Sequence, residues 1–244
     1  MISPQLVQSL SYAMLAVIAA LIGGVVAIYY RPGPVTESNL QHLSAGIIFA
    51  AVAANLLPDV HAQAPVFVVV GFGLGVATML AVHQLSRRIE NAGVGGGFAG
   101  ATSFIIAVSL NTLIDGILIG VAFLNAPKTG VIISLALAFE TLFIAATAVT
   151  MLPKSLSTVR KLSVPLLFGG LMLFGVTAGT LVFGGLSGAP IAIVIAFGAA
   201  NLIYLVTEEL LVKAAKVPET PTSTTLFFAG FLLIFIFDMV YTLA

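Results

Sequence analysis

The chain has 244 residues, of which 60% are hydrophobic and only 7% are charged. Soluble domains carry about 25% charged residues, so this composition indicates a helical protein that crosses a membrane several times. The numbers of basic and acidic residues are equal, and there are no cysteines. Disulfides and thiolate metal sites are therefore excluded. The few basic residues lie in short connecting segments, which argues against a nucleic-acid partner.

Eight hydrophobic segments are each long enough to cross the hydrocarbon core of a bilayer as a helix of roughly 20 residues. Turn residues separate them, including Pro58-Asp59 after the second segment and a glycine-rich stretch at residues 93–97, which is predicted to be a flexible connector. We expect an all-α polytopic membrane protein in which residues 1–244 form a single transmembrane domain. The predicted spans are residues 6–29, 40–57, 66–85, 100–124, 130–152, 164–183, 189–212 and 224–243.

The distribution of lysine and arginine predicts the orientation, because cytoplasmic loops are enriched in these residues. One side of the membrane holds Lys128 alone. Both termini should therefore lie outside the cytoplasm, and we expect an integral protein in the lipid bilayer of a prokaryotic cytoplasmic (inner) membrane. The loops after the first, third, fifth and seventh spans hold the other basic residues: Arg31, Arg87, Arg88, Lys154, Arg160, Lys161, Lys213 and Lys216.

Two acids lie near the middle of adjacent spans, Asp115 in the fourth and Glu140 in the fifth, although the chain has only nine acidic residues. A carboxylate at bilayer depth is costly and usually marks an ion path, a proton relay or a binding site. The structural alternative for Asp115 is hydrogen bonding to neighbouring polar side chains, such as Ser109 or Thr112. Asn111 projects from the same helix face as Asp115, either as a ligand or as a hydrogen-bonding contact between helices.

The segments around the two acids are similar, since Asp115-Gly-Ile-Leu-Ile-Gly parallels Glu140-Thr-Leu-Phe-Ile-Ala. Consecutive spans run antiparallel, so the similarity indicates an inverted pair whose acids meet at the midplane of the membrane. Two carboxylates at such a short distance repel each other unless a cation or a proton lies between them. We therefore expect Asn111, Asp115 and Glu140 to bind one divalent cation. Such oxygen ligands suit Mn²⁺, Mg²⁺, Ca²⁺ or Fe²⁺ better than they select Zn²⁺.

The second span ends in Asn55-Leu-Leu-Pro-Asp59, and Asn55 and Asp59 share a helix face. Asp59 is either a solvated acid at a helix end or an entrance site that attracts cations. His42 opens the same span on the cytoplasmic side, where it is either an interfacial residue or a ligand. All three are candidates for the pathway of the ion.

The seventh span ends in Thr207-Glu-Glu-Leu-Leu-Val-Lys213. Glu209 and Lys213 have the spacing of an i,i+4 pair, which favours a plain interfacial salt bridge. Glu208 is in register with Asn201 one heptad earlier, so these two residues could line an inner exit. They complete the set of candidate pathway residues.

At these positions the chain resembles the ZIP family of divalent-metal transporters. The resemblance covers nearly the whole chain, with eight spans, acids in the fourth and fifth, residues 56–59 (Leu-Leu-Pro-Asp) and residues 208–210 (Glu-Glu-Leu). The fourth span of the family typically reads His-Asn-x-Pro-Glu-Gly, where this chain has Asn111-Thr-Leu-Ile-Asp115-Gly. Asn111 thus replaces a histidine ligand and Asp115 a bridging glutamate. The fifth-span motif falls on residues 136–141, where Glu140 matches its glutamate.

The chain also departs from the family at four further positions. Thr112 and Leu137 stand where the family often places ligands of a second metal, so we expect one metal site and not two. Ile114 and Phe139 replace the two prolines of the motifs. Because proline kinks a helix, the fourth and fifth spans should be more regular than those of the family.

The resemblance implies a 3+2+3 arrangement, in which an inverted repeat of spans one to three and six to eight encloses the fourth and fifth. It also implies transport of a divalent metal cation toward the cytoplasm by an elevator-like movement, and it allows a homodimer. The oxygen ligands and the metals of the family together favour Mn²⁺ or Fe²⁺ as the transported ion, with Zn²⁺ as the next choice. The metal would be a substrate, so no cofactor is expected.

Other functions could use the same two acids. An intramembrane hydrolase could use two acids around a water, but neither acid lies in a Gly-x-Gly-Asp-like segment, so we do not expect an enzyme. A structural or metal-sensing membrane protein could use the acids to hold the bundle together without transport. A carrier of organic cations could use the same acids to bind its substrate.

Overall fold

The computed structural model describes residues 3–93 and 98–243. The described residues are mostly helical and include no strand. Eight helical spans are long and apolar enough to cross a membrane, which confirms the prediction of an all-α polytopic membrane protein. Most of the glycine-rich stretch for which a connector was predicted, residues 94–97, lies outside the described residues.

The helical spans begin at Pro4, Pro34, Pro65, Ala99, Pro127, Thr158, Ala189 and Pro221. Proline occupies one of the first two positions of most of them, where its missing N–H would have no partner in the helix anyway. The elements are α1 (Pro4–Tyr29), α2 (Pro34–Ala51) with η1 (Val52–Leu56) and α3 (Leu57–His61), α4 (Pro65–Asn91), α5 (Ala99–Asn125), α6 (Pro127–Met151), α7 (Thr158–Phe183), α8 (Ala189–Tyr204) with η3 (Leu205–Leu210) and α9 (Leu211–Ala214), and α10 (Pro221–Leu243).

Two spans contain a π-helical segment, η1 in the second and η3 in the seventh. The second span does not end at Pro58, as the sequence predicted, but continues as α3 to His61. Proline normally breaks a helix because it cannot donate to the i−4 carbonyl and clashes with it. Here it follows a π-helix, in which Leu57 already donates to the more distant carbonyl of Val52. The regular hydrogen-bond pattern is therefore interrupted before the proline is reached.

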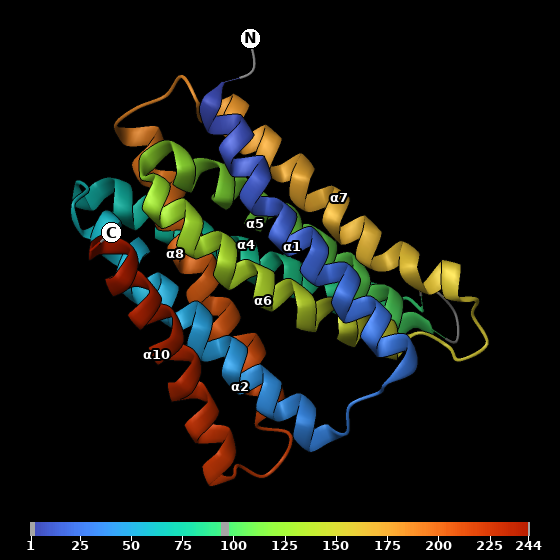
Figure 1. Ribbon diagram of the computed structural model, residues 1–244. Coiled ribbons are helices and arrows are strands. Elements are labelled where there is room, and N and C mark those ends of the chain that lie inside the picture. Colours follow the sequence, from blue (N-terminus) through green and yellow to red (C-terminus); the bar gives the residue numbers. More distant parts are fainter. Residues whose placement is uncertain (1–2, 94–97, 244) are drawn as a thin grey trace.

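The helices pack mainly in pairs. α1 packs along α6 and α7, α5 along α7, α2 along α10, and α4 along α8. Figure 1 shows α1 and α7 side by side along one flank of the bundle and α2 beside α10 on the other. α4 and α10 bury the smallest share of their apolar windows, which is typical of helices that face lipid. α5 and α6, which carry the two central acids, are much more buried and contact each other.

Small residues allow the helices around the centre to approach closely. A Cβ on Gly116 of α5 would clash with the backbone of α7, because it would lie 2.4 Å from the carbonyl oxygen of Met172 and 3.0 Å from the Cα of Gly175. Such small-residue contacts are the usual means of close packing between membrane helices. α5 and α6 are also continuous α-helices without internal proline. This continuity agrees with the regular fourth and fifth spans predicted from the missing prolines, and it gives the central acids a rigid support.

The charged side chains separate toward the two ends of the bundle. At one end, which we call the basic end, the Arg31 guanidinium donates to the carbonyl of Leu152, and Lys213 and Lys216 line one pocket with the start of α2. At the opposite end the Lys128 ammonium lies 2.9 Å from Asp238. The loops predicted to share one side of the membrane therefore lie at the same end of the molecule.

Candidate functional site

The two central acids meet through one amide group. Asn111 Nδ2 on α5 donates to Asp115 Oδ2 at 2.9 Å and to Glu140 Oε1 of α6 at 3.3 Å. The side chains of Asn111, Asp115 and Glu140 are 6%, 3% and 2% exposed. The three residues predicted to bind one ion therefore form one buried cluster. Asn111 and Asp115 are brought together by their shared helix face, and Glu140 by the packing of α6 against α5.

A fourth polar residue, Asn201 of α8, completes this cluster. Its Nδ2 donates to Asn111 Oδ1 at 3.4 Å, and its side chain is fully buried. The sequence suggested Asn201 for an inner exit, whereas the structure brings it to the centre. The sequence did contain a signal for this central position, because Asn201 lies near the middle of the seventh span. Asn111, Asp115 and Glu140 lie near the middle of their own spans. We call these four residues the central cluster.

Three oxygen atoms of the central cluster have no hydrogen-bond partner among the described residues. They are Asp115 Oδ1, Glu140 Oε2 and Asn201 Oδ1. A buried oxygen without a partner is costly, so three of them in one connected cluster suggest a ligand that offers positive charge or hydrogen-bond donors. A hard divalent cation meets this requirement, because carboxylate and amide oxygens are its preferred ligands.

The donor set consists of two carboxylates and two amides. Within residues 3–93 and 98–243, no group of three or more histidine, cysteine, aspartate or glutamate side chains is placed to hold a metal ion. A bound cation would therefore depend on the amide oxygens as well as on the acids. This composition fits Mn²⁺ and Mg²⁺ better than Zn²⁺, which prefers imidazole and thiolate ligands.

Glu209 of η3 is less exposed than its neighbour Glu208. The Glu209 side chain is 28% exposed and is ion-paired to Lys213, whereas Glu208 is exposed. A regular α-helix would place Glu208 on the face of Asn201, as the sequence suggested. The π-helix at Leu205–Leu210 adds one residue to the turn and so moves Glu209 onto that face.

Among the described residues, no hydrogen bond joins the predicted pathway residues of the second span to the central cluster. Asp59 Oδ2 accepts hydrogen bonds from Asn125 Nδ2 at 2.9 Å and from Thr129 Oγ1 at 3.2 Å. Asp59 thus joins α3 to the ends of α5 and α6 at the end opposite the basic end. Asn55 lies in η1, buried and with no partner for its Nδ2 among the described residues. His42 is buried in α2, with Nδ1 2.9 Å from the carbonyl of Ser38.

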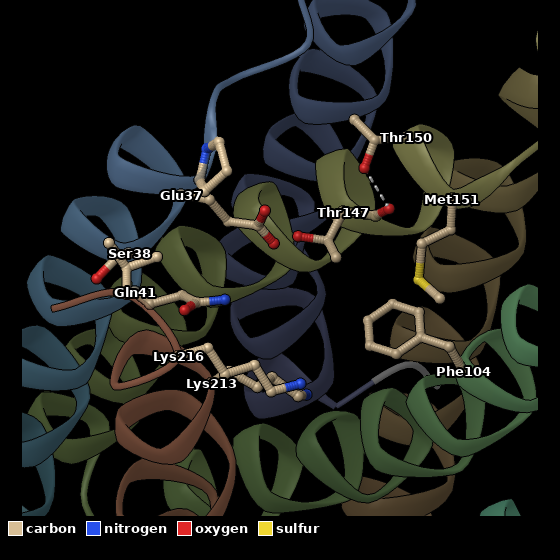
Figure 2. Close-up of a pocket in the computed structure, with 11 residues that line it drawn as sticks. Glu37, Ser38, Gln41, Phe104, Thr147, Thr150, Met151, Lys213 and Lys216 are labelled. Carbon is tan, nitrogen blue, oxygen red and sulfur yellow. Dashed lines mark hydrogen bonds between the residues drawn. The ribbon is translucent and has the colours of Figure 1, made fainter.

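A pocket opens at the basic end of the bundle, with a volume of about 460 Å³. Figure 2 shows Glu37 and Gln41 of α2 on one side of it and Phe104 of α5 on another, with Lys213 and Lys216 entering from the end of the seventh span. Lys213 lies one helical turn beyond Glu209, to which it is ion-paired at 3.1 Å.

Comparisons with known proteins do not assign this chain to a family, since no family model matches it and no curated protein matches it. Its functional interpretation therefore depends on the central cluster, on the two ends of the bundle and on the motifs in the sequence.

Proposed function

We propose that this protein is a membrane transporter that moves a divalent metal cation of the Mn, Fe or Zn class toward the cytoplasm, as a divergent relative of the ZIP family. The observation that carries the proposal is the buried convergence of Asp115 and Glu140, each with one unpartnered oxygen, near the middle of adjacent spans. Acids at this depth are rare unless they serve an ion or proton path. The cation would be bound by both acids, Asn111 and Asn201.

The packing of the helices supports the proposed inverted repeat. In a 3+2+3 arrangement α1 corresponds to α7, α2 to α8, α4 to α10, and α5 to α6. The packing of α1 on α6 then corresponds to that of α7 on α5, and the packing of α2 on α10 to that of α8 on α4. The two π-helices also fall in corresponding spans, η1 in the second and η3 in the seventh. Inverted repeats are a common basis for alternating access.

The central cluster suggests how binding would proceed. Without a cation, the Asn111 N–H groups lie between the two carboxylates and reduce their repulsion. A bound cation would take over this role, because two carboxylates neutralise a charge of two. The Asn111 amide would then turn its oxygen toward the ion. A proton that binds one of the acids would compete with the metal, since both occupy the same carboxylates.

The test is uptake of metal ions by proteoliposomes. We expect the wild-type protein to transport at least one of Mn²⁺, Fe²⁺, Zn²⁺, Cd²⁺ and Mg²⁺, and we expect Asp115→Ala and Glu140→Ala to lose this uptake. Removal of either acid leaves too few anionic ligands to replace the hydration shell of the ion. The matched control is Glu90→Ala, which removes an exposed acid at the end of α4 and should transport like the wild type.

Full uptake by both central variants would refute the binding site, and flux of an organic cation such as choline without any metal flux would favour the organic-cation carrier. The proposal would be supported if the wild type and Glu90→Ala transport Mn²⁺ and the variants Asp115→Ala and Glu140→Ala do not.

A second function is favoured by the same hydrogen bonds. Asn111 already donates to both acids, so the central cluster could join α5, α6 and α8 in a protein that binds metal without transport. Thermal stabilisation of the purified protein by Mn²⁺, together with no flux of any metal in liposomes, would favour this metal-sensing or structural role.

A further inference from the structure

The turn that joins α5 to α6 is bonded to other helices at the end of the bundle opposite the basic end. A single residue, Ala126, separates the two helices. On one side of this turn, Asp59 Oδ2 of α3 accepts hydrogen bonds from Asn125 Nδ2 at 2.9 Å and from Thr129 Oγ1 at 3.2 Å. One carboxylate thus holds the last residue of α5 and the first turn of α6. Hydrogen bonds to a charged acceptor are the stronger kind.

The same turn is also bonded to α10. The Lys128 ammonium of α6 lies 2.9 Å from Asp238 Oδ1, and the two side chains are 35% and 14% exposed. An ion pair that is partly buried is screened less than one at the surface. We call the five side chains of these contacts the polar clamp: Asp59, Asn125, Lys128, Thr129 and Asp238.

The polar clamp joins two groups of helices. α5 and α6 pack along α7 and α1, which also pack on each other. α2 packs along α10, and α4 along α8. Asp59 and Asp238 belong to the second group, whereas the other members of the clamp belong to the first. The clamp therefore holds the two helices that carry the central acids against the helices around them.

The space between the clamp and the central cluster is filled with apolar side chains. The residues of α5 and α6 that are fully buried in this interval include Ile119, Phe123, Ile132, Ile133 and Leu137. A second pocket, of about 320 Å³, lies at this end, but it is lined by residues of helix ends and turns, such as Asn125 and Ser187. It therefore does not extend toward the central acids.

The opposite direction is more open. The pocket of about 460 Å³ at the basic end is lined by Thr147 of α6 and by Gln41 of α2. Thr147 lies about two helical turns from Glu140 on the same helix. Gln41 lies about two turns inside the start of α2 at Pro34. The two ends of the bundle thus differ, since one is bonded and filled and the other is hollowed.

We propose that the polar clamp closes the end of the bundle opposite the basic end, so that in this conformation the central cluster is reached from the basic end alone. This inference rests on the proposed function and adds the contacts that alternate its access. For an ion to enter from the opposite end, the α5–α6 turn must leave Asp59 and Asp238. Transport therefore requires the clamp to break and to form again in each cycle.

The experiment measures how fast a buried cysteine near the clamp reacts with N-ethylmaleimide in the purified full-length protein. The reporter is Asn55→Cys, in a chain that otherwise has no cysteine. Asn55 is buried about one turn inside Asp59, its Nδ2 has no partner among the described residues, and its segment η1 packs on α6 and α8. We expect Asp59→Ala to raise the reaction rate about tenfold, because loss of the clamp increases the open population.

A second variant and a matched control accompany this measurement. Lys128→Gln removes the other half of the clamp and keeps Asp59, so it tests the inference even if Asp59→Ala does not fold. We expect it to raise the reaction rate as well. The control is Gln63→Ala at the same end, since the Gln63 amide donates to the backbone carbonyl of Asp59 in its own segment. This variant should leave the reaction rate unchanged.

A cross-link tests the other direction. Asp59 and Thr129 are directly bonded, so a short bis-methanethiosulfonate reagent should join the pair Asp59→Cys and Thr129→Cys and hold the clamp closed. We expect the joined protein to lose Mn²⁺ uptake in liposomes and to recover it when a reducing agent cleaves the link. The wild type, treated in the same way, should keep its uptake because it has no cysteine.

The outcomes separate this inference from the proposed function. If Mn²⁺ uptake depends on Asp115 but neither Asp59→Ala nor Lys128→Gln speeds the labelling of Asn55→Cys, the clamp is wrong and the transport site stands. Uptake at the wild-type rate by the cross-linked protein would also overturn the clamp. The labelling needs no metal, so faster labelling in a protein that transports no metal would refute the proposed function and leave the closure of this end supported.

Discussion

Asn111 is the residue on which the central cluster depends, because its single Nδ2 group donates to both acids. Its Oδ1 in turn accepts from Asn201. An amide is well suited to this place, since it offers donors to the carboxylates in the absence of an ion and an oxygen when a cation is present. Under the proposed function, Asn111 would therefore act in both the ion-free and the ion-bound protein.

Replacement of this residue tests that dual role. We expect Asn111→Ala to lower the free energy of unfolding by about 1–3 kcal/mol, because both acids lose their shared donor, and we expect added Mn²⁺ to restore part of the loss. The measurement is the thermal transition of the protein in detergent with and without Mn²⁺. Ser134→Ala is the control, since it removes a buried hydroxyl that bonds only to its own helix at Gly130. A variant as stable as the wild type would contradict the role of Asn111.

At the level of elements, the π-helix η3 determines which side chains of the seventh span face the centre. A π-helix adds a residue to one turn and so rotates everything after it. Glu209 and Lys213 thereby become half-buried, with side chains 28% and 37% exposed, and Glu208 is exposed. Nothing in the local sequence Leu205-Val-Thr-Glu-Glu-Leu210 marks a π-helix. The spacing of a regular helix, counted seven residues on from Asn201, therefore predicted that Glu208 shares its face.

Two neighbouring glutamates allow this register to be tested directly. We expect Glu209→Gln to raise the KM for Mn²⁺ uptake about tenfold, because it removes a negative charge from the helix face that carries Asn201 and releases its ion-pair partner Lys213. Glu208→Gln should leave the KM unchanged, since its side chain is exposed. The measurement is the initial rate of uptake in liposomes as a function of Mn²⁺ concentration. The reverse result would mean that the seventh span is a regular α-helix in the membrane.

At the level of the whole molecule, the basic residues lie at one end and the Lys128–Asp238 pair lies at the other. Because positive residues are retained on the cytoplasmic side, this asymmetry predicts that the basic end faces the cytoplasm. The pocket lined by Lys213 and Lys216 would then be the inner mouth, and the carboxylate of Asp59 would lie near the outer surface.

The absence of cysteine allows this orientation to be measured with single cysteines. We expect Ser187→Cys, in the exposed turn between α7 and α8, to react with a membrane-impermeant maleimide in intact cells. Ser155→Cys, in the exposed turn between α6 and α7, should react only after the cells are permeabilised. Both positions are exposed, so each variant is the control for the other. Labelling of Ser155→Cys alone in intact cells would reverse the orientation.

The sequence by itself determined the eight spans and the depth of the central acids. Long apolar segments must satisfy their backbone hydrogen bonds internally in lipid, so they form helices. The i,i+4 spacing of Asn111 and Asp115 fixed their shared face. The rarity of acids in such segments singled out Asp115 and Glu140 as functional residues before any contact between helices was known.

Only the tertiary structure decided which distant side chains join these residues. Asn201 reaches Asn111 because α8 packs beside α5, and no local pattern encodes that contact. Glu209, and not Glu208, is the half-buried glutamate because a π-helix changes the register of the seventh span. The second span continues past Pro58 after another π-helix. Periodicity describes a regular helix, whereas irregular turns are held by packing against neighbours. The membership of the central cluster therefore follows from the assembled bundle.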